Sequence, residues 1–129
     1  MTHAEIDDAL AAHLHAAGIG APIVWPNATE APERPFLSYL PPSGEREGGS
    51  LKGGTIARET GVLQVQVVAA DNTGRSAALA LAEAVAAAFA EGTRLAGGRI
   101  EIPAPPSVRQ GFAAGGDWIV PVVIRYRAP

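Results

Sequence analysis

The three histidines of the sequence, His3, His13 and His15, are the side chains best suited to metal or proton chemistry. All three lie in or beside one predicted helix. A zinc site needs several ligands that converge on one point. His13 and His15 are two residues apart and point to different faces of a helix, while His3 lies too far along the helix to join His13. The spacing therefore predicts no metal site, and we expect the histidines to be solvated or at the edge of the core.

The remaining polar residues show no pattern typical of an active site. The acidic residues fall in the first turns of helices and in loops, so no two carboxylates are predicted to converge. Ser76 and Ser107 have no histidine nearby in the sequence. The Gly pairs at 48–49 and 53–54 do not stand between a strand and a helix, as phosphate-binding glycines do. We predict that the chain is not an enzyme and has no catalytic, cofactor-binding or metal-binding residues; a triad assembled from distant residues, in a small cytosolic enzyme or ligand-binding module, remains an alternative.

Composition narrows the class of protein. The chain has 129 residues, which is the size of one domain, a formal net charge of −3 and no cysteine. Binding to a phosphate backbone needs a clustered basic surface, so the acidic balance argues against it. Without cysteine there is no disulfide framework or thiol nucleophile. We see no secretion signal and no apolar run long enough to span a membrane, so we expect synthesis in the cytoplasm and no membrane association.

Helical signals appear twice. Thr2 and Glu5 form a capping-box pattern before apolar residues at helical spacing, which predicts a helix from about His3 to Ala17 that Gly18 and Gly20 end. A second helix is predicted from about 74 to 90, with Asn72 or Thr73 as its cap. Nearly all of its residues are apolar. We therefore expect this helix to be buried around most of its circumference or covered by a second chain.

Strand signals make up most of the rest. We predict strands at 23–25, at 36–40 where Pro41 and Pro42 close the strand, at 56–70 where two faces alternate, at 99–102, at 107–112 and at 118–126. Pro121 cannot donate a hydrogen bond, so its part of the last strand is expected to face an edge or a bulge. The predicted fold class is α+β: a mostly antiparallel or mixed sheet of five to six strands, with two helices on one face, in a single domain spanning residues 1–129.

The segment from about 43 to 55 has almost nothing to bury, which predicts a flexible loop or an extended hairpin tip. Its charged residues, together with Leu51 and the charged residues that follow it, are our candidates for contacts with other subunits. A plain surface ion pair between residues 58 and 59 is the alternative for those two. The candidate interface residues are Glu45, Arg46, Glu47, Leu51, Lys52, Arg58 and Glu59.

Five segments taken in order resemble one known family. They are Ile23-Val24-Trp25-Pro26-Asn27, Arg34-Pro35-Phe36-Leu37, 61–68 leading into the Ala-rich helix, Ala104-Pro105-Pro106-Ser107, and 118–126. Together they resemble the tail terminator family of long-tailed phages (siphoviruses) and of phage-derived gene transfer agents. The Glu-containing loop around 28–33 and the Pro-rich, low-aromatic composition depart from the family pattern.

The resemblance implies a structural virion protein that forms a homohexameric ring. Such a ring caps the tail tube, stops its polymerisation and joins the tail to the neck or head-completion proteins, at the head-proximal end of the tail. It implies tail tube protein and other copies of the chain as partners, DNA that passes through the ring without specific binding, and no cofactor. Another head–tail connector, acting in the neck or in head completion, is the alternative within the same class.

Overall fold

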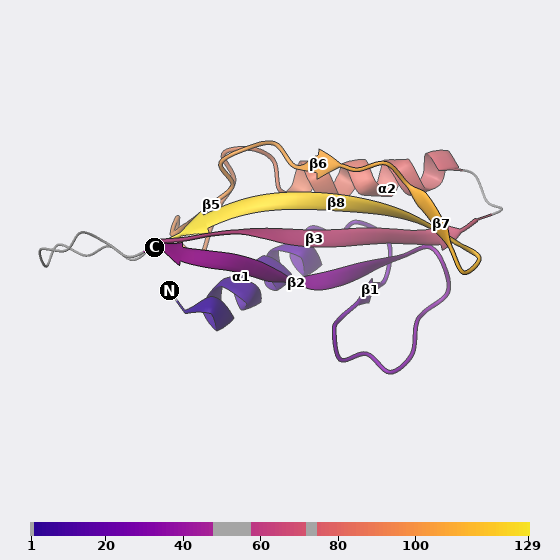
Figure 1. The fold of residues 1–129 in the computed structure, drawn as a ribbon, viewed down its shortest axis with the longest axis horizontal. Helices are drawn as coiled ribbons and strands as arrows, with labels where there is room; N and C mark the ends of the chain where they lie inside the picture. The colour runs from indigo at the N-terminus through magenta and orange to yellow at the C-terminus, as the bar shows by residue number, and fades with distance from the viewer. Residues whose placement is uncertain (1, 48–57, 72–74) are drawn as a thin grey trace, which may run out of the picture.

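The computed structural model describes residues 2–47, 58–71 and 75–129. These residues form two α-helices and a mixed sheet of eight strands, so the predicted α+β class is confirmed, with more short strands than expected. Figure 1 shows the long strands of the sheet running along the length of the molecule. The elements in chain order are α1 (His3–Ala16), β1 (Ile23–Val24), β2 (Phe36–Glu47), β3 (Arg58–Ala70), α2 (Arg75–Ala88), β4 (Arg94–Leu95), β5 (Ile100–Glu101), β6 (Ser107–Val108), β7 (Phe112–Ala114) and β8 (Asp117–Ala128).

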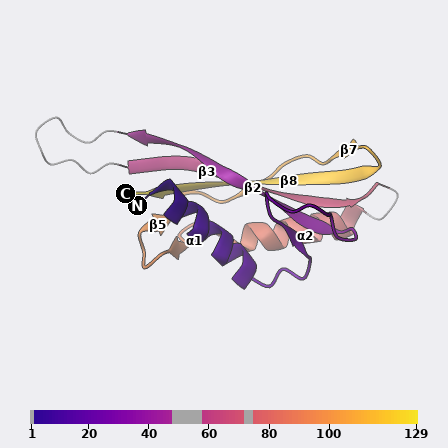
Figure 2. The same ribbon diagram turned by 90° about the horizontal axis from the view of Figure 1, so that it is seen from below.

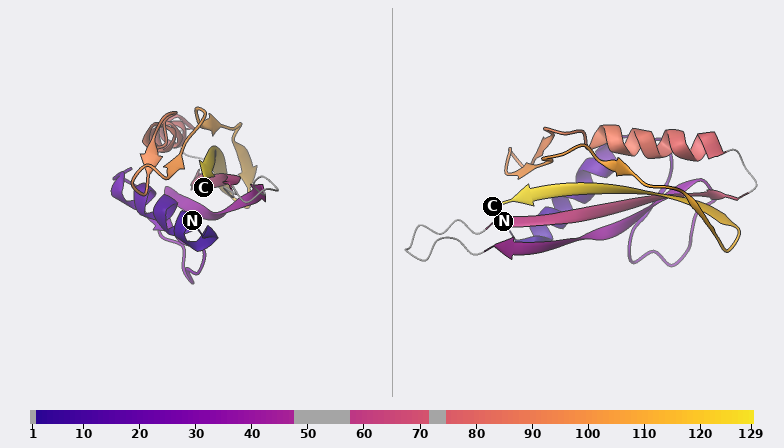
Figure 3. Two further views of the ribbon diagram at one scale, coloured as in Figure 1. Left: turned by 90° about the vertical axis from the view of Figure 1, so that its left-hand side faces the viewer. Right: turned by 45° about the horizontal axis from the view of Figure 1, so that its top comes forward.

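The sheet has the strand order β1-β2-β3-β8-β5-β4, and β6 and β7 pair with β8 along the same side as β5. Only β1 and β2 are parallel; every other pair in the described chain is antiparallel. Both helices cover one face of the sheet, as predicted (Figures 2 and 3). We call the opposite face, which no helix covers, the open face.

Alternation along β3 and β8 places the core between the sheet and the helices. Every second residue of β3 from Leu63 to Ala69 is buried, and so is every second residue of β8 from Val120 to Ala128. Burying an aliphatic side chain contributes about 1.5–3 kcal/mol. The predicted apolar face of the long strand is therefore confirmed. From the helices the core receives Ile6, Leu10, Leu14, Ala78, Ala82 and Val85, followed by Phe89 just beyond α2.

Helix α1 begins at the predicted capping box. The Thr2 hydroxyl accepts the Glu5 amide at 3.1 Å, and the Glu5 carboxylate accepts the Thr2 amide at 3.4 Å. The hydrogen bonds with Thr2 lower the pKa of Glu5. Gly18, just after the helix, has a φ of 61°, which a residue without a side chain adopts at little cost.

Thr2→Ala is expected to lower the free energy of unfolding by about 1 kcal/mol, because the Glu5 amide loses its acceptor. Urea unfolding monitored by circular dichroism measures this change. Thr2→Ser keeps the hydroxyl and should stay within about 0.3 kcal/mol of the parent. Equal losses in the two variants would show that the cap contributes nothing.

Strand β2 does not stop at its prolines, so the predicted end at Pro41 was wrong. The ladder with β3 shifts between Leu40 and Ser43, where β2 has one residue more than its partner. This β-bulge absorbs the two prolines, and pairing then continues to Glu47 opposite Arg58. The part of the predicted loop at 43–47 is therefore strand, while 48–55 lies outside the described residues.

The prediction that α2 is buried around most of its circumference was wrong for the single chain. Only Ala78, Ala82 and Val85 are fully buried in it, and Leu79 is 46% exposed. Small alanine side chains let the helix lie close to β8 and β3, and the sheet then covers only one side of it. The alternative, that a second chain covers the other side, stays a prediction. The cap candidates Asn72 and Thr73 lie outside the described residues.

The predicted strand at 107–112 is divided into β6 and β7, and the division lies beside Pro121. The Arg109 amide donates to the Pro121 carbonyl at 2.8 Å. In a strand, the nitrogen and carbonyl of one residue point to the same side. The nitrogen of Pro121 therefore faces the interval between β6 and β7 rather than β3, which confirms the expectation of an edge or bulge there.

Candidate interaction surfaces

Strand pairing brings five of the seven candidate interface residues together at one end of the sheet. Glu45 lies opposite Thr60, Arg46 opposite Glu59, and Glu47 opposite Arg58. The first turn of α1 and the end of β8 reach the same end, where both chain termini lie (Figure 1). Leu51 and Lys52 lie outside the described residues. We call this end of the molecule the hairpin end.

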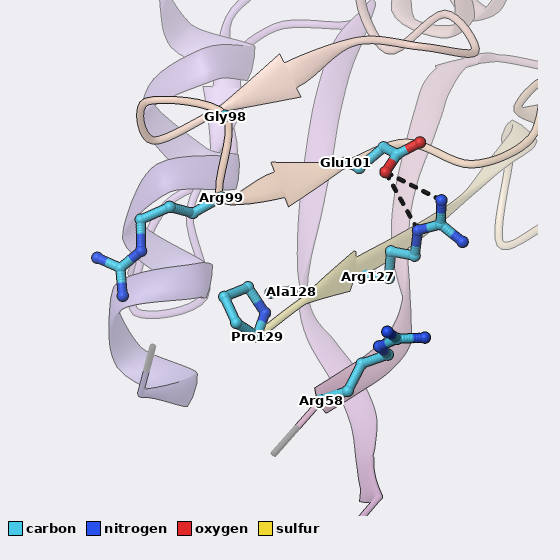
Figure 4. A pocket seen from close by; sticks show the side chains of 7 residues that line it. All are labelled: Arg58, Gly98, Arg99, Glu101, Arg127, Ala128 and Pro129. Carbon is cyan, nitrogen blue, oxygen red and sulfur yellow. Dashed lines mark hydrogen bonds and ion pairs between the residues drawn. The ribbon is translucent and has the colours of Figure 1, made fainter. Parts of the chain in front are cut away.

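A hollow of about 320 Å³ at the hairpin end is rich in guanidinium groups. Figure 4 shows Arg127 reaching Glu101, while Arg58 extends to the same side and Arg99 points the other way. Two nitrogens of Arg127 donate to Glu101 at 3.0 and 3.2 Å, and Arg94 lies 3.8 Å from the same carboxylate. Two arginines thus lie against one acidic side chain, while Arg58 and Arg99 line the same hollow without contacting it. Planar guanidinium groups bind carboxylates in bidentate fashion. This surface is suited to an acidic partner.

Sequence patterns could identify Arg58 at this surface but none of the other arginines. Arg94, Arg99 and Arg127 are brought there by the β4–β5 pair and by the return of β8 alongside it. Glu101 faces Arg127 directly in the ladder. No local spacing indicates a contact between residues this far apart, so only the sheet topology could have revealed it.

Glu59 is not the exposed member of a surface ion pair, and that alternative was wrong. Its side chain is only 2% exposed, because its position in β3 faces the helices. The Tyr126 hydroxyl donates to its Oε2 at 2.8 Å, and the His3 Nδ1 lies 3.1 Å from the same oxygen. Burial first, and then the bond to Glu59, raise the pKa of Tyr126 far above its usual value. Glu59 therefore holds α1 and β8 together at the hairpin end.

Two glycines make room for the Tyr126 hydroxyl. A Cβ on Gly61 would lie 2.5 Å from this oxygen and 2.6 Å from the Ser43 carbonyl oxygen. A Cβ on Gly44, which pairs with Gly61 across the strands, would lie 2.7 Å from the hydroxyl. Contacts this short are far below van der Waals separation. The glycines are thus required by the packing of Tyr126, which sequence patterns did not indicate.

The other tyrosine makes an equivalent link further along the sheet. The Tyr39 hydroxyl, on β2, donates to Asp7 Oδ1 on α1 at 2.5 Å, and its ring lies 5.2 Å from that of Trp25. Burial, followed by the bond to Asp7, raises the pKa of Tyr39 strongly. Both tyrosines are therefore buried hydroxyls that donate to a carboxylate on another element.

The open face carries several apolar side chains that the single chain leaves partly exposed. Register places one residue from each of four neighbouring strands in a row across it. Phe112, at one end of this row, is 44% exposed, and Leu40 and Val62 elsewhere on the face are 36% and 38% exposed. Partly exposed apolar side chains that gather on one face are typical of a contact surface. The row consists of Phe36, Val68, Ile119 and Phe112, of which Val68 is buried by its neighbours and the other three are partly exposed.

A groove of about 500 Å³ lies between the start of α2 and the β6–β8 region. Leu79 and Val108 line it, and Trp118 forms part of its wall. The Arg75 guanidinium carbon lies 4.2 Å from the Trp118 ring centroid, a cation–π contact. Arg109 lines the other side. The groove thus combines an apolar floor with two cationic side chains.

The histidines do not meet. His13 donates from Nε2 to the Ala88 carbonyl at 2.6 Å and makes an edge contact with Phe89, so it joins α1 to the end of α2. Among residues 2–47, 58–71 and 75–129, no three His, Asp or Glu side chains are grouped as metal ligands. Neither helix of the described chain has the length and hydropathy needed to cross a membrane.

Comparison with known proteins agrees with the architecture. The family model described as "Phage tail terminator protein" matches residues 5–126. One solved structure, whose name states no function, is 22% identical with a TM-score of 0.69, covering 98% of this chain and 92% of that one. A chain from a structure of the virion of a native gene transfer agent particle is 18% identical with a TM-score of 0.59, covering 95% and 91%. No curated protein matches the sequence.

Proposed function

The chain belongs to the phage tail terminator family, and from this premise we propose that it ends tail-tube growth as a subunit of a ring. Membership makes it a structural tail protein of a virion or phage-like particle. The ring we propose is a homohexamer that caps the tube at the head-proximal end of the tail, joins it to the neck, and lets DNA pass without specific binding. The observation that carries the proposal is the family match over 122 of the 129 residues, 5 to 126 inclusive.

The geometry supports a role in assembly. The buried polar cluster of Glu59, Tyr126 and His3 joins β3, β8 and α1 through its side-chain contacts. The exposed features are surfaces: the arginine-rich hollow, the apolar open face and the groove beside α2. An assembly protein needs several contact surfaces of this kind, while an enzyme needs converging reactive groups. We therefore propose a non-catalytic role.

We assign the contact with the tail tube to the hairpin end. Arg58 is exposed there, and its guanidinium makes no ion pair with the described residues. Glu59 is buried beneath this surface, where it binds Tyr126 and His3, and we do not assign it a contact with a partner. Glu45, Arg46, Glu47, Leu51 and Lys52 remain our proposed contacts from the β2–β3 hairpin. An acidic patch on the tube end is the complement that these arginines predict.

Arg58→Glu is expected to weaken binding to the tail tube by about tenfold or more, because it replaces attraction with repulsion at the contact. Particles carrying the variant should have tails that are longer and less uniform, as measured by electron microscopy. His15→Glu, which adds a negative charge at an exposed position of α1 outside the hairpin end, serves as the control and should leave tail length unchanged. Uniform tails of normal length in Arg58→Glu would remove the hairpin end from the proposal.

Co-purification separates a terminator from another neck protein. The tagged chain should retain tail tube protein from a lysate of cells that assemble the particle, and should not retain the portal in the absence of tails. Retention of the portal alone would identify a head-completion protein instead.

A further inference from the structure

The groove beside α2 combines positive charge with an apolar floor, and both features restrict the kind of partner that it can bind. Arg75 and Arg109 are both exposed, and neither pairs with a carboxylate in the described chain. Leu79, at 46% exposure, is the most exposed large apolar side chain in the described part of the molecule. A segment with two acidic side chains spaced by small apolar residues would satisfy both features.

This chain presents such a segment at its opposite edge. Residues 26–33, between β1 and β2, are exposed except for a half-buried Pro32, and they contain Glu30 and Glu33 beside Ala28 and Ala31. Neither glutamate makes an ion pair with a described residue. We call residues 26–33 the acidic loop. Its base is held in place, because Arg34 donates to Asp117 Oδ1 at 2.5 Å and to the Gly116 carbonyl at 3.2 Å.

The acidic loop and the groove lie on opposite edges of the sheet. Figure 1 shows the loop extending below β2 while α2 and β6 lie beyond β8, and the right-hand view of Figure 3 shows the same separation. Both features are towards the end of the long strands that carries β7. A closed ring needs a heterologous interface, in which one edge of each subunit meets the opposite edge of the next.

We propose that the acidic loop of one copy occupies the groove of the next copy, with Glu30 and Glu33 facing Arg75 and Arg109. This contact rests on the proposed function, because it assumes that the chain forms a ring, and it specifies which surfaces of neighbouring copies meet. The small apolar residues of the loop cover Leu79 and Trp118, and the two carboxylates offset the two guanidinium charges. The stacking of Arg75 on Trp118 holds one of these cations over the apolar floor.

Charge reversal on each side tests the interface. The variants are a loop variant, Glu30→Lys with Glu33→Lys, and a groove variant, Arg75→Glu with Arg109→Glu. Native mass spectrometry of each variant alone should show loss of the ring to monomers. An equimolar mixture should regain rings of alternating composition, because each new contact then joins opposite charges. Asp8→Lys with Glu91→Lys changes the net charge as the loop variant does, at exposed positions outside both features, and should keep the ring.

A crosslink gives a second measurement, in assembled tails. The chain has no cysteine, so Ala31→Cys with Ser76→Cys should yield covalent multimers on oxidation, while either substitution alone should not. Rings that survive both charge reversals, or an absence of crosslinked multimers, would overturn the interface. If rings and crosslinks form as expected but tail length stays normal in cells that lack the protein, the interface would stand and the proposed function would be overturned. Crosslinking of the groove to tail tube or neck protein would reassign its occupant.

Discussion

Above about pH 10 the folded protein is expected to lose stability steeply, by about 2.7 kcal/mol per pH unit. The sequence contains two tyrosines, and both are buried, at 3% and 1% exposure for Tyr39 and Tyr126. Burial and a bond to a carboxylate raise the pKa of each above the usual 10.0. In the unfolded chain they ionise near pH 10, whereas in the folded chain they stay protonated. Each therefore stabilises the fold fully below pH 10 and loses that contribution as the pH rises.

Urea unfolding between about pH 9 and 11.5 measures this slope, and the ultraviolet absorbance of tyrosinate reports ionisation in the same samples. Few other groups interfere in this range, because Lys52 is the only lysine in the sequence and arginine ionises at higher pH. Tyr126→Phe should reduce the slope to about 1.4 kcal/mol per pH unit, since only Tyr39 then releases a proton on unfolding. A reversible tyrosinate signal near pH 10 in protein that is still folded would contradict the burial of these hydroxyls.

The second large effect is expected at Gly61. Gly61→Ala should lower the free energy of unfolding by about 2–3 kcal/mol, since the new methyl group would overlap both the Tyr126 hydroxyl and the Ser43 carbonyl oxygen. The carbonyl belongs to the backbone of β2, so the clash is relieved only if the β2–β3 ladder shifts. Urea unfolding at neutral pH measures the loss.

Two comparisons isolate the cause of that loss. Gly44→Ala meets only side-chain atoms, so it should cost less than Gly61→Ala, and Tyr126→Phe should recover part of that smaller cost. Thr60→Ala, at the exposed position next to Gly61, should change stability by no more than about 0.5 kcal/mol. A Gly61→Ala variant as stable as Thr60→Ala would show that Tyr126 does not lie where the structure places it.

The elements that sequence reasoning found are those with strong local patterns. The capping box at Thr2 and the alternation from Val62 to Ala69 are periodic signals, and the helix and strand they predict are present. The end predicted at Pro41 was wrong because a proline is a local signal, and a bulge lets the ladder continue past it. Burial of α2 was overestimated, since the sequence gives hydropathy but not which side of a helix a sheet will cover.

The candidate surfaces were less predictable than the fold. Arg58 and Glu59 were both predicted as interface contacts, but one is exposed and the other buried, because adjacent residues of a strand face opposite sides. The link from Glu59 to Tyr126 spans 67 residues, and no pattern within a helix or strand encodes it. The same holds for Arg127 and Glu101, whose contact depends on the order of strands in the sheet.

The prolines in β2 also affect whether strands of two copies can pair edge to edge. Beyond Ser38 the outer side of β2 has no partner strand among the described residues, and an unpaired strand edge readily recruits the same edge of another copy. Pro41 and Pro42 lack amide hydrogens and bend the strand there, which makes that margin a poor template for adding a further strand. Open-ended fibrils through this margin are thereby disfavoured, and self-association is left to side-chain surfaces that can be satisfied by a finite number of copies.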